Sequence, residues 1–325
     1  MSKLLTVSPS PHVFTDDSTR KIMYRVVYAL IPALVWSVFV FGLDALRVTA
    51  IAIISCLALE YVIQKYLMKV KPSIYDGSAI VTGILLAFNV PASIPWWIIV
   101  IGAVASIGIG KLSFGGLGNN IFNPAMVGRV FLLISFPVQM THWPANQQSE
   151  VDSVTTATPL GIIKEGLTSG TPVSQITQKL PDASDMLLGN IGGSLGEISA
   201  LMIFLGGAYM LFRKVITWHI PVSILATVVI IAGVFRLADP QTYVSPVYHL
   251  LTGGLMLGAV FMATDMVSSP MTRKGQLIYG VGIGVITISI RLFGAYPEGI
   301  SFGILIMNAF TPLINNYMKP KRFGG

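Results

Sequence analysis

Ten apolar runs dominate this sequence and constrain its fold more than any other feature. They cover residues 22–42, 47–67, 77–90, 96–110, 123–137, 198–213, 215–235, 247–264, 275–293 and 300–317. A helix needs ~20 mostly apolar residues to cross the hydrocarbon core of a membrane. Only 11% of the 325 residues are charged, against ~25% in an ordinary globular domain, so most of this chain lacks the charge to form a hydrated surface. The sequence therefore predicts an all-α integral membrane protein with about ten transmembrane helices.

The distribution of Lys and Arg predicts the orientation of these helices. On one side the loops and tails hold Lys3, Arg20, Lys21, Lys65, Lys69, Lys71, Lys111, Arg213, Lys214, Arg273, Lys274, Lys319, Lys321 and Arg322. The short loops of the other side hold only Arg47, Arg236 and Arg291. The polar segment before the first run is not typical of a signal peptide. We therefore expect a multi-pass protein of the bacterial inner membrane with both termini in the cytoplasm (N-in/C-in). The net charge of +7 is spread over short loops, which argues against a nucleic-acid partner.

One long hydrophilic stretch divides the chain into two halves. We expect a cytoplasmic tail at 1–21, five helices in 22–137, an extracytoplasmic loop at 138–197, five helices in 198–317 and a cytoplasmic tail at 318–325. An odd number of helices in each half makes any repeat an inverted one, as in many transporters. Thr82-Gly83 recurs as Thr252-Gly253, and Asn123-Pro124 has a counterpart in Tyr296-Pro297. Equally, Gly and Pro simply recur in membrane helices.

Several common functional signals are missing. The single cysteine, Cys56, excludes an intrachain disulfide and a Cys-based metal site, and its apolar surroundings predict a small buried side chain. Gly110-Lys111 lacks the first glycine and the final Ser or Thr of a phosphate loop. Gly280, Gly282 and Gly284 lie within an apolar run and favour close helix packing over dinucleotide binding. No catalytic residue and no metal ligand are assigned.

The hydrophilic loop contains the segment Asp152-Ser-Val-Thr-Thr-Ala-Thr158. It resembles the flavinylation motif, Asp-x-x-Ser/Thr-Gly-Ala-Thr, in which a separate flavin transferase joins FMN to the last Thr by a phosphoester bond. Thr156 stands where the motif usually has Gly. The resemblance implies a covalent FMN on Thr158.

Further motifs extend over nearly the whole chain. They are Ser8-Pro-Ser-Pro-His12, Asp76-Gly-Ser-Ala-Ile-Val-Thr-Gly83, Asn123-Pro-Ala-Met-Val-Gly-Arg129, Ala263-Thr-Asp265 with Ser269-Pro270, and Tyr296-Pro-Glu-Gly299 followed by Asn308 and Pro312. In order and spacing they resemble the NqrB/RnfD family, and the short N-terminus is similar to its RnfD branch. Asn315-Asn316 stands where the family often has an acidic residue.

The resemblance implies a membrane subunit of an Rnf-type complex, which couples electron transfer between ferredoxin and NAD to translocation of sodium ions or protons. It also implies partner subunits, a covalent flavin on the outer side and a second, non-covalent flavin such as riboflavin deeper in the membrane. Three alternatives stay open: an NqrB-like subunit of a quinone-reducing sodium pump, a flavin-free small-solute permease, and a flavin-free scaffold for other subunits.

Ionisable side chains at membrane depth are costly and so are functional candidates. Near the cytoplasmic ends of the helices we place Asp76, Asn119, Asn120, Asn123, Arg129 and Asp265. Arg129, with Asn123 and Asp76, is our candidate for an inner flavin site, because a guanidinium stabilises negative charge on a flavin. The alternative is that Arg129 pairs with Asp76 or Asp265. Glu60 and Asp265 are our candidates for ion coupling.

On the outer side, four side chains are candidates for lining a cavity around the Thr158 flavin. They are His249, Arg236, Arg291 and Glu298. They are equally interpreted as anchors at the membrane interface.

Overall fold

The computed structural model describes residues 17–143, 158–189, 191–197 and 199–319, which form helices and no β-strand. Within this part of the chain, every predicted apolar run contains helix. The helices are α1 (Thr19–Phe41), α2 (Leu43–Val62) continued by η1 (Ile63–Leu67), α3 (Ser78–Phe88), α4 (Trp96–Ala103) continued by η3 (Val104–Ile109), α5 (Pro124–Ser135), α10 (Ala200–Phe212), α11 (His219–Ala238), α12 (Pro246–Leu251), α13 (Leu255–Leu257) continued by η5 (Gly258–Met262), α14 (Arg273–Phe293) and α15 (Ile300–Tyr317). The all-α membrane architecture predicted from the sequence is confirmed.

Five helical segments in the described ranges are long and apolar enough to cross a membrane, namely 19–41, 43–67, 96–114, 219–238 and 273–293. By contrast, α3, α5 and α10 have 11, 12 and 13 residues. At 1.5 Å per residue they are roughly 16–20 Å long, well short of the ~30 Å hydrocarbon core. Not all of the ten predicted runs are therefore full-length helices.

Irregular backbone continues two of these short helices, and its polar groups pair with each other. The chain after α3 accepts hydrogen bonds from the chain that leads into α10: Leu195 N donates to Val90 O at 3.4 Å, and Gly196 N donates to Phe88 O at 2.9 Å. Non-helical backbone at membrane depth is tolerated only where protein satisfies it. This pairing joins the end of α3 to the segment that leads into α10.

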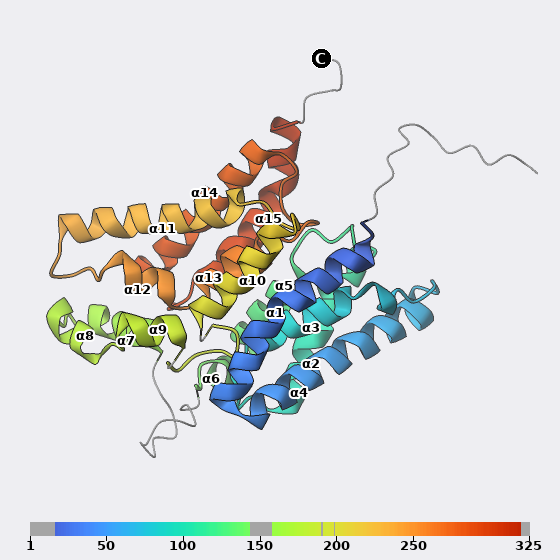
Figure 1. The fold of residues 1–325 in the computed structure, drawn as a ribbon, viewed down its shortest axis with the longest axis horizontal. Coiled ribbons are helices and arrows are strands. Elements are labelled where there is room, and N and C mark those ends of the chain that lie inside the picture. The colour runs from blue at the N-terminus through green and yellow to red at the C-terminus, as the bar shows by residue number, and fades with distance from the viewer. Residues whose placement is uncertain (1–16, 144–157, 190, 198, 320–325) are drawn as a thin grey trace, which may run out of the picture.

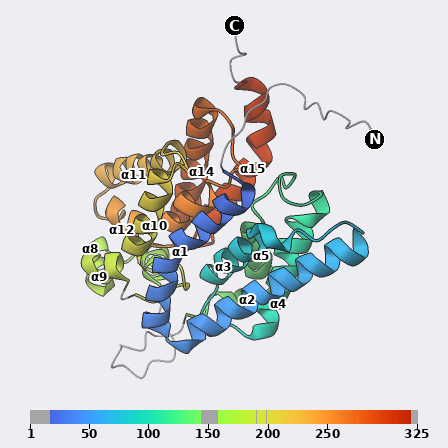
Figure 2. The ribbon, with the colours of Figure 1, turned by 45° about the vertical axis from the view of Figure 1, so that its right-hand side comes forward.

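The two halves lie side by side. α1 packs along α10, while α11 packs on α14 and α14 on α15. Three short helices, α7 (Pro159–Thr168), α8 (Val173–Lys179) and α9 (Ala183–Leu188), lie at the opposite end of the molecule from the first turn of α1 and the last turn of α15 (Figures 1 and 2).

Two hydrophobic cores hold the fold. The larger one runs through both halves and includes the fully buried Cys56, as predicted. The smaller one packs Leu160, Ile163 and Ile176 of α7 and α8 beneath α12. Close helix approach relies on glycine: a Cβ on Gly83 would lie 2.7 Å from the Ile53 Cα atom.

The proposed repeat pairs occupy different local structures. Gly83 lies inside α3, whereas Gly253 lies in the break between α12 and α13 with φ of 70°. Asn123 caps α5, whereas α15 begins after Gly299, two residues beyond Pro297. The inverted repeat therefore stays a prediction.

Candidate functional site

Thr158 opens onto a cavity of about 410 Å³, here called the Thr158 cavity. Its lining includes Arg129 of α5, Glu298 and Tyr296 before α15, and His142 and Trp143. Pockets of ~300–1,000 Å³ hold small molecules and cofactors. The cavity thus has the volume, the charged groups and the aromatic rings that a flavin-sized ligand requires.

Thr158 is the N-cap residue of α7. Its Oγ1 accepts a hydrogen bond from Gly161 N at 3.1 Å, and Pro159 occupies the first helical position. The hydroxyl therefore lies at the positive end of a ten-residue helix, where backbone N–H groups favour a phosphate. The preceding motif residues, Asp152 to Ala157, lie outside the described residues.

Arg129 is buried at the Thr158 cavity and bonded to three side chains. Its Nη1 donates to Asn89 Oδ1, and its Nη2 lies 3.2 Å from Glu197 Oε1 and also contacts Glu298 Oε2. The side chains of Arg129 and Glu197 are each only 5% exposed. The guanidinium thus holds two carboxylates at the cavity wall and joins the first half of the chain to the second.

Arg291 closes the break between α12 and α13. Its guanidinium donates to the carbonyl oxygens of His249, Thr252 and Gly253 at 2.5, 2.9 and 3.1 Å. On the α7 side, Lys164 Nζ donates to the Arg291 carbonyl at 3.4 Å, and partial burial lowers the pKa of Lys164. Arg291 therefore stabilises the break between α12 and α13 and is not among the residues that line the Thr158 cavity.

A second polar centre lies around a buried ion pair. Lys111 Nζ contacts Glu60 Oε1 and Oε2 at 2.8 and 2.7 Å and donates to Ser78 Oγ at 2.6 Å. Ser78 Oγ in turn donates to Asp76 Oδ1 at 2.6 Å. The side chains of Lys111 and Glu60 are 2% and 0% exposed. Glu60, predicted as a carboxylate for ion coupling, is thus already neutralised by a lysine.

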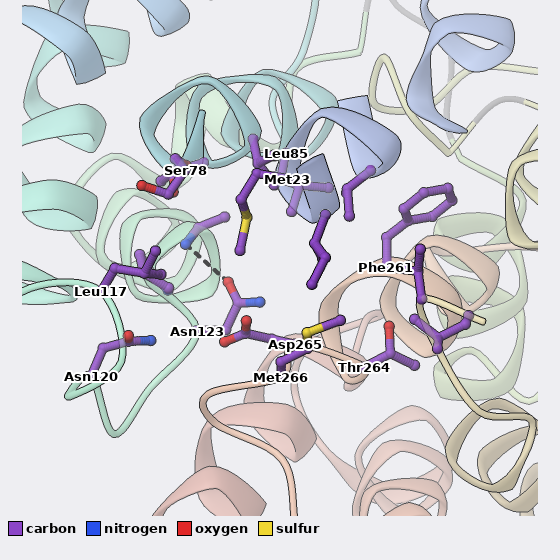
Figure 3. A pocket seen from close by; sticks show the side chains of 18 of the residues that line it. Met23, Ser78, Leu85, Leu117, Asn120, Asn123, Phe261, Thr264, Asp265 and Met266 are labelled. Atoms are coloured by element: carbon purple, nitrogen blue, oxygen red, sulfur yellow. Dashed lines mark hydrogen bonds between the residues drawn. The ribbon is translucent and has the colours of Figure 1, made fainter. Parts of the chain in front are cut away.

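Lys111 lines a smaller cavity of about 70 Å³, here called the Lys111 cavity, together with Asn120, Asn123, Thr264 and Asp265 (Figure 3). Asp265 Oδ2 accepts a hydrogen bond from Ser268 Oγ at 2.8 Å. Asn123 Oδ1 caps α5 through the N–H groups of Ala125 and Met126. A cavity of this size has room for a few water molecules.

A chain of buried contacts connects the two cavities. Asn89, which accepts from Arg129, has its Nδ2 atom 3.7 Å from the sulfur of Met262. The Met262 carbonyl accepts from Asn123 Nδ2 at 3.0 Å. Asn89 and Asn123 are 0% and 3% exposed. Both belong to the first half of the chain, and both contact Met262 of the second half.

The structure does not bring Arg129 together with Asn123 and Asp76, and the role of these residues at an inner flavin stays a prediction. Asn123 lines the Lys111 cavity and Asp76 contacts Ser78 there, but Arg129 lines the Thr158 cavity. Arg129 lies six residues beyond Asn123, about 9 Å further along the helix axis, so it belongs to the other centre. The predicted pairing of Arg129 with Asp76 or Asp265 was wrong, because the carboxylate partners of Arg129 are Glu197 and Glu298.

The four predicted outer residues also separate in the structure. Glu298 lines the Thr158 cavity, His249 and Arg291 lie at the α12 break, and Arg236 Nη1 donates to Tyr243 O at 3.4 Å. Sequence reasoning missed Glu197, Asn89 and Lys111 as site residues. A lone polar residue near the end of the apolar run 77–90 was the available signal at Asn89, and the single lysine after the run 96–110 was the signal at Lys111.

The fold and its two polar centres define a helical membrane protein with a cofactor-sized cavity where its halves meet. The model of the NQR2, RnfD, RnfE family matches residues 6–324, so the chain belongs to this family.

Similar curated proteins are named as subunits of related complexes. One from Clostridium ljungdahlii belongs to a "Proton-translocating ferredoxin:NAD(+) oxidoreductase complex" and is 47% identical over 99% of this chain and 96% of its own length. One from Acetobacterium woodii belongs to a "Na(+)-translocating ferredoxin:NAD(+) oxidoreductase complex" and is 48% identical over 98% of this chain and 95% of its own length. A third, from the "Ion-translocating oxidoreductase complex" of Stutzerimonas stutzeri, is 39% identical over 95% of this chain and 93% of its own length.

Proposed function

We propose that this chain is the flavin-carrying membrane subunit of an Rnf-type complex, in which electron transfer between ferredoxin and NAD drives translocation of sodium ions or protons. Full-length similarity to subunits of complexes with those names supports the complex and its reaction. The observation that carries the flavin assignment is the position of the Thr158 hydroxyl, at a helix N-terminus and in the wall of a 410 Å³ cavity.

The residues of the Thr158 cavity fit an FMN joined to Thr158. The N-terminus of α7 favours the phosphate, and the rings of Trp143 and Tyr296 offer stacking surfaces. When bound, the flavin supplies one-electron transfer. Arg129 is already bonded to Asn89, Glu197 and Glu298, so its main effect is to fix the cavity wall rather than to supply a free positive charge.

Attachment needs a separate flavin transferase. The Thr158 oxygen forms a phosphoester with the FMN phosphate of FAD, the pyrophosphate bond breaks and AMP leaves. In our proposal residues 138–197 lie outside the cytoplasmic membrane and both termini lie inside. The placement of α7–α9 opposite the first turn of α1 and the last turn of α15 supports that orientation (Figure 1).

The second, non-covalent flavin is a separate part of the proposal. Its candidate residues Asn123 and Asp76 lie at or beside the Lys111 cavity. That cavity has about 70 Å³, so a tricyclic flavin ring would enter only after the surrounding side chains move. Acid extraction of the purified complex, with flavin quantified per copy of this chain, tests this: a non-covalent flavin is released and the covalent one is retained.

The attachment site is tested by in-gel flavin fluorescence under denaturing conditions, from cells that contain the transferase. Thr158→Val removes both the hydroxyl and the helix cap, so Thr158→Asn is the sharper variant, because Asn caps helices well but offers no hydroxyl. We expect fluorescence in wild type and Thr158→Ser, and none in Thr158→Asn or Thr158→Val. Thr168→Val, an exposed threonine of the same helix, is the matched control and should stay fluorescent.

Two results would overturn parts of this assignment. A wild-type band without fluorescence excludes the covalent flavin and favours the flavin-free permease or scaffold. Fluorescence that survives in Thr158→Asn moves the attachment to Thr155 or Thr156. Ferredoxin-dependent NAD reduction, compared with quinone reduction by the same complex, separates the Rnf-type function from the NqrB-like alternative.

A further inference from the structure

Asn120 carries a buried hydrogen-bond acceptor without a partner among the described residues. Its side-chain Nδ2 donates to Phe122 O at 3.0 Å, but its Oδ1 has no donor. The residue is only 4% exposed and lines the Lys111 cavity together with Asn123 and Asp265 (Figure 3). Leaving a buried acceptor unpaired is unfavourable, so this oxygen calls for a ligand in the cavity.

Asp265 brings a negative charge to the same cavity. One of its oxygens accepts from Ser268 Oγ, and within the described ranges no lysine, arginine or histidine forms an ion pair with it. A carboxylate at membrane depth is costly unless a positive charge compensates it. The cavity therefore combines a carboxylate that forms no ion pair within the described ranges with an unpaired amide oxygen.

Lys111 does not supply the missing charge. An ammonium group has three N–H donors, and Glu60 and Ser78 already occupy them at 2.6 to 2.8 Å. Lys111 and Glu60 together sum to zero charge. An ionised Asp265 carries one negative charge, which matches one monovalent ion.

We propose that the Lys111 cavity binds a monovalent cation of sodium size between the carboxylate of Asp265 and Oδ1 of Asn120, with water molecules as further ligands. Hard cations take oxygen ligands of these kinds. The cavity of about 70 Å³ holds such an ion with a few waters. This inference rests on the proposed function and adds the site at which the transported ion binds.

The electrostatic surroundings favour reversible binding. α3 and α5 begin at Ser78 and Pro124, which both line the cavity, so the positive ends of two helices face the ion. These helix ends oppose a second positive charge in the cavity and weaken the binding of the first. An ion in transit has to leave as well as enter, and a divalent cation is disfavoured.

The experiment uses the purified whole complex and measures ferredoxin-dependent NAD reduction at increasing Na⁺, with direct binding by sodium-23 NMR. Losing one ligand should weaken Na⁺ binding about tenfold. We therefore expect Asn120→Ala to raise the half-saturating Na⁺ concentration about tenfold. Asp265→Asn should abolish the saturable Na⁺ dependence. Asn119→Ala, the exposed neighbour of the same type, is the matched control and should behave as wild type.

A paired variant distinguishes this site from one on Glu60. Lys111→Met alone would leave Glu60 buried and unpaired and is expected to fold poorly. The double variant Lys111→Met/Glu60→Gln keeps the charge balance, and we expect its half-saturating Na⁺ concentration to stay within about threefold of wild type, because only a neutral pair is removed. Loss of the Na⁺ dependence in a folded double variant would place the ion on Glu60 and overturn the proposal.

Two further outcomes would also overturn it. One is equal behaviour of Asn120→Ala and Asn119→Ala. The other is a wild-type rate that depends on pH but has no saturable Na⁺ dependence, which would make the proton the coupling ion. In that case flavin fluorescence and NAD reduction persist, so the proposed function stands while the cation site fails.

Discussion

Arg129 and Glu197 form an ion pair between the first half of the chain and the segment that leads into the second half. Nη2 and Oε1 lie 3.2 Å apart, and both side chains are 5% exposed. Arg129 comes from a short helix of the first half, whereas Glu197 precedes the first helix of the second half. Because the guanidinium also contacts Asn89 and Glu298, this pair connects the wall of the Thr158 cavity to the backbone that joins the halves.

Breaking this pair should destabilise the protein strongly. Removing one partner of a buried ion pair leaves an uncompensated charge and costs about 3–5 kcal/mol, so we expect Arg129→Met to lower the free energy of unfolding by that amount. The measurement is thermal or denaturant unfolding in detergent. Arg47→Met is the control, because Arg47 and Asp44 form an exposed pair, 52% and 56% exposed, worth about 0–1 kcal/mol. Equal effects of the two substitutions would contradict a buried structural pair.

Gly254 should tolerate no side chain. Its φ is +62°, and an added Cβ would lie 2.4 Å from Glu197 Oε1, so Gly254→Ala combines backbone strain with displacement of the Glu197 carboxylate. We expect a loss of about 1–3 kcal/mol in the free energy of unfolding, measured by the same unfolding assay. Gly193→Ala, with no atom within 4 Å of its added Cβ, should stay within about 0.5 kcal/mol of wild type.

The turn after α11 should loosen at acidic pH. Asp239 Oδ1 accepts from the N–H groups of Gln241 and Thr242 at 3.1 and 3.3 Å. Hydrogen bonding from the Thr242 side chain, helped by those two N–H groups, lowers the pKa of Asp239. A lowered folded-state pKa stabilises the turn above the unfolded-state value, about 3.9, and this contribution is lost as the pH falls through the folded-state pKa.

Amide hydrogen exchange at Gln241 and Thr242 measures this effect. After correction for the intrinsic rate, their protection should fall between pH 7 and pH 3 in wild type. Asp239→Asn should show no such step, because its side chain does not titrate. A wild-type protection that is the same at both pH values would contradict the role of the carboxylate.

Hydrophobicity predicted which segments are helical, because a residue in lipid has to be apolar whatever its neighbours are. The runs of α3 and α5, 77–90 and 123–137, are already short for a full span, but hydrophobicity did not predict the lengths of α3, α5 and α10. Their lengths depend on which backbone groups find partners elsewhere, and Val90 and Phe88 find them in Leu195 and Gly196, more than 100 residues away. Sequence periodicity carries no information about such pairing.

Some residues of the candidate site were predicted from the sequence, and others were found only in the structure. Thr158, Arg129, Glu298, Asn123 and Asp265 were all singled out from the sequence, since polar side chains stand out in an apolar chain. Their partners were not: Lys111 reads as a loop lysine and Glu197 as the end of a hydrophilic stretch. Pairing depends on distances between elements, and Lys111 lies 51 residues from Glu60.

By itself, then, the sequence determined that this protein is a helical membrane protein with a polar loop between two apolar halves, because the energetics of lipid act on each segment locally. The tertiary structure alone decided that Arg129 belongs with Thr158 and that Lys111 neutralises Glu60. Charges buried in a membrane select their partners by position in space, and only the packing of the two halves sets those positions.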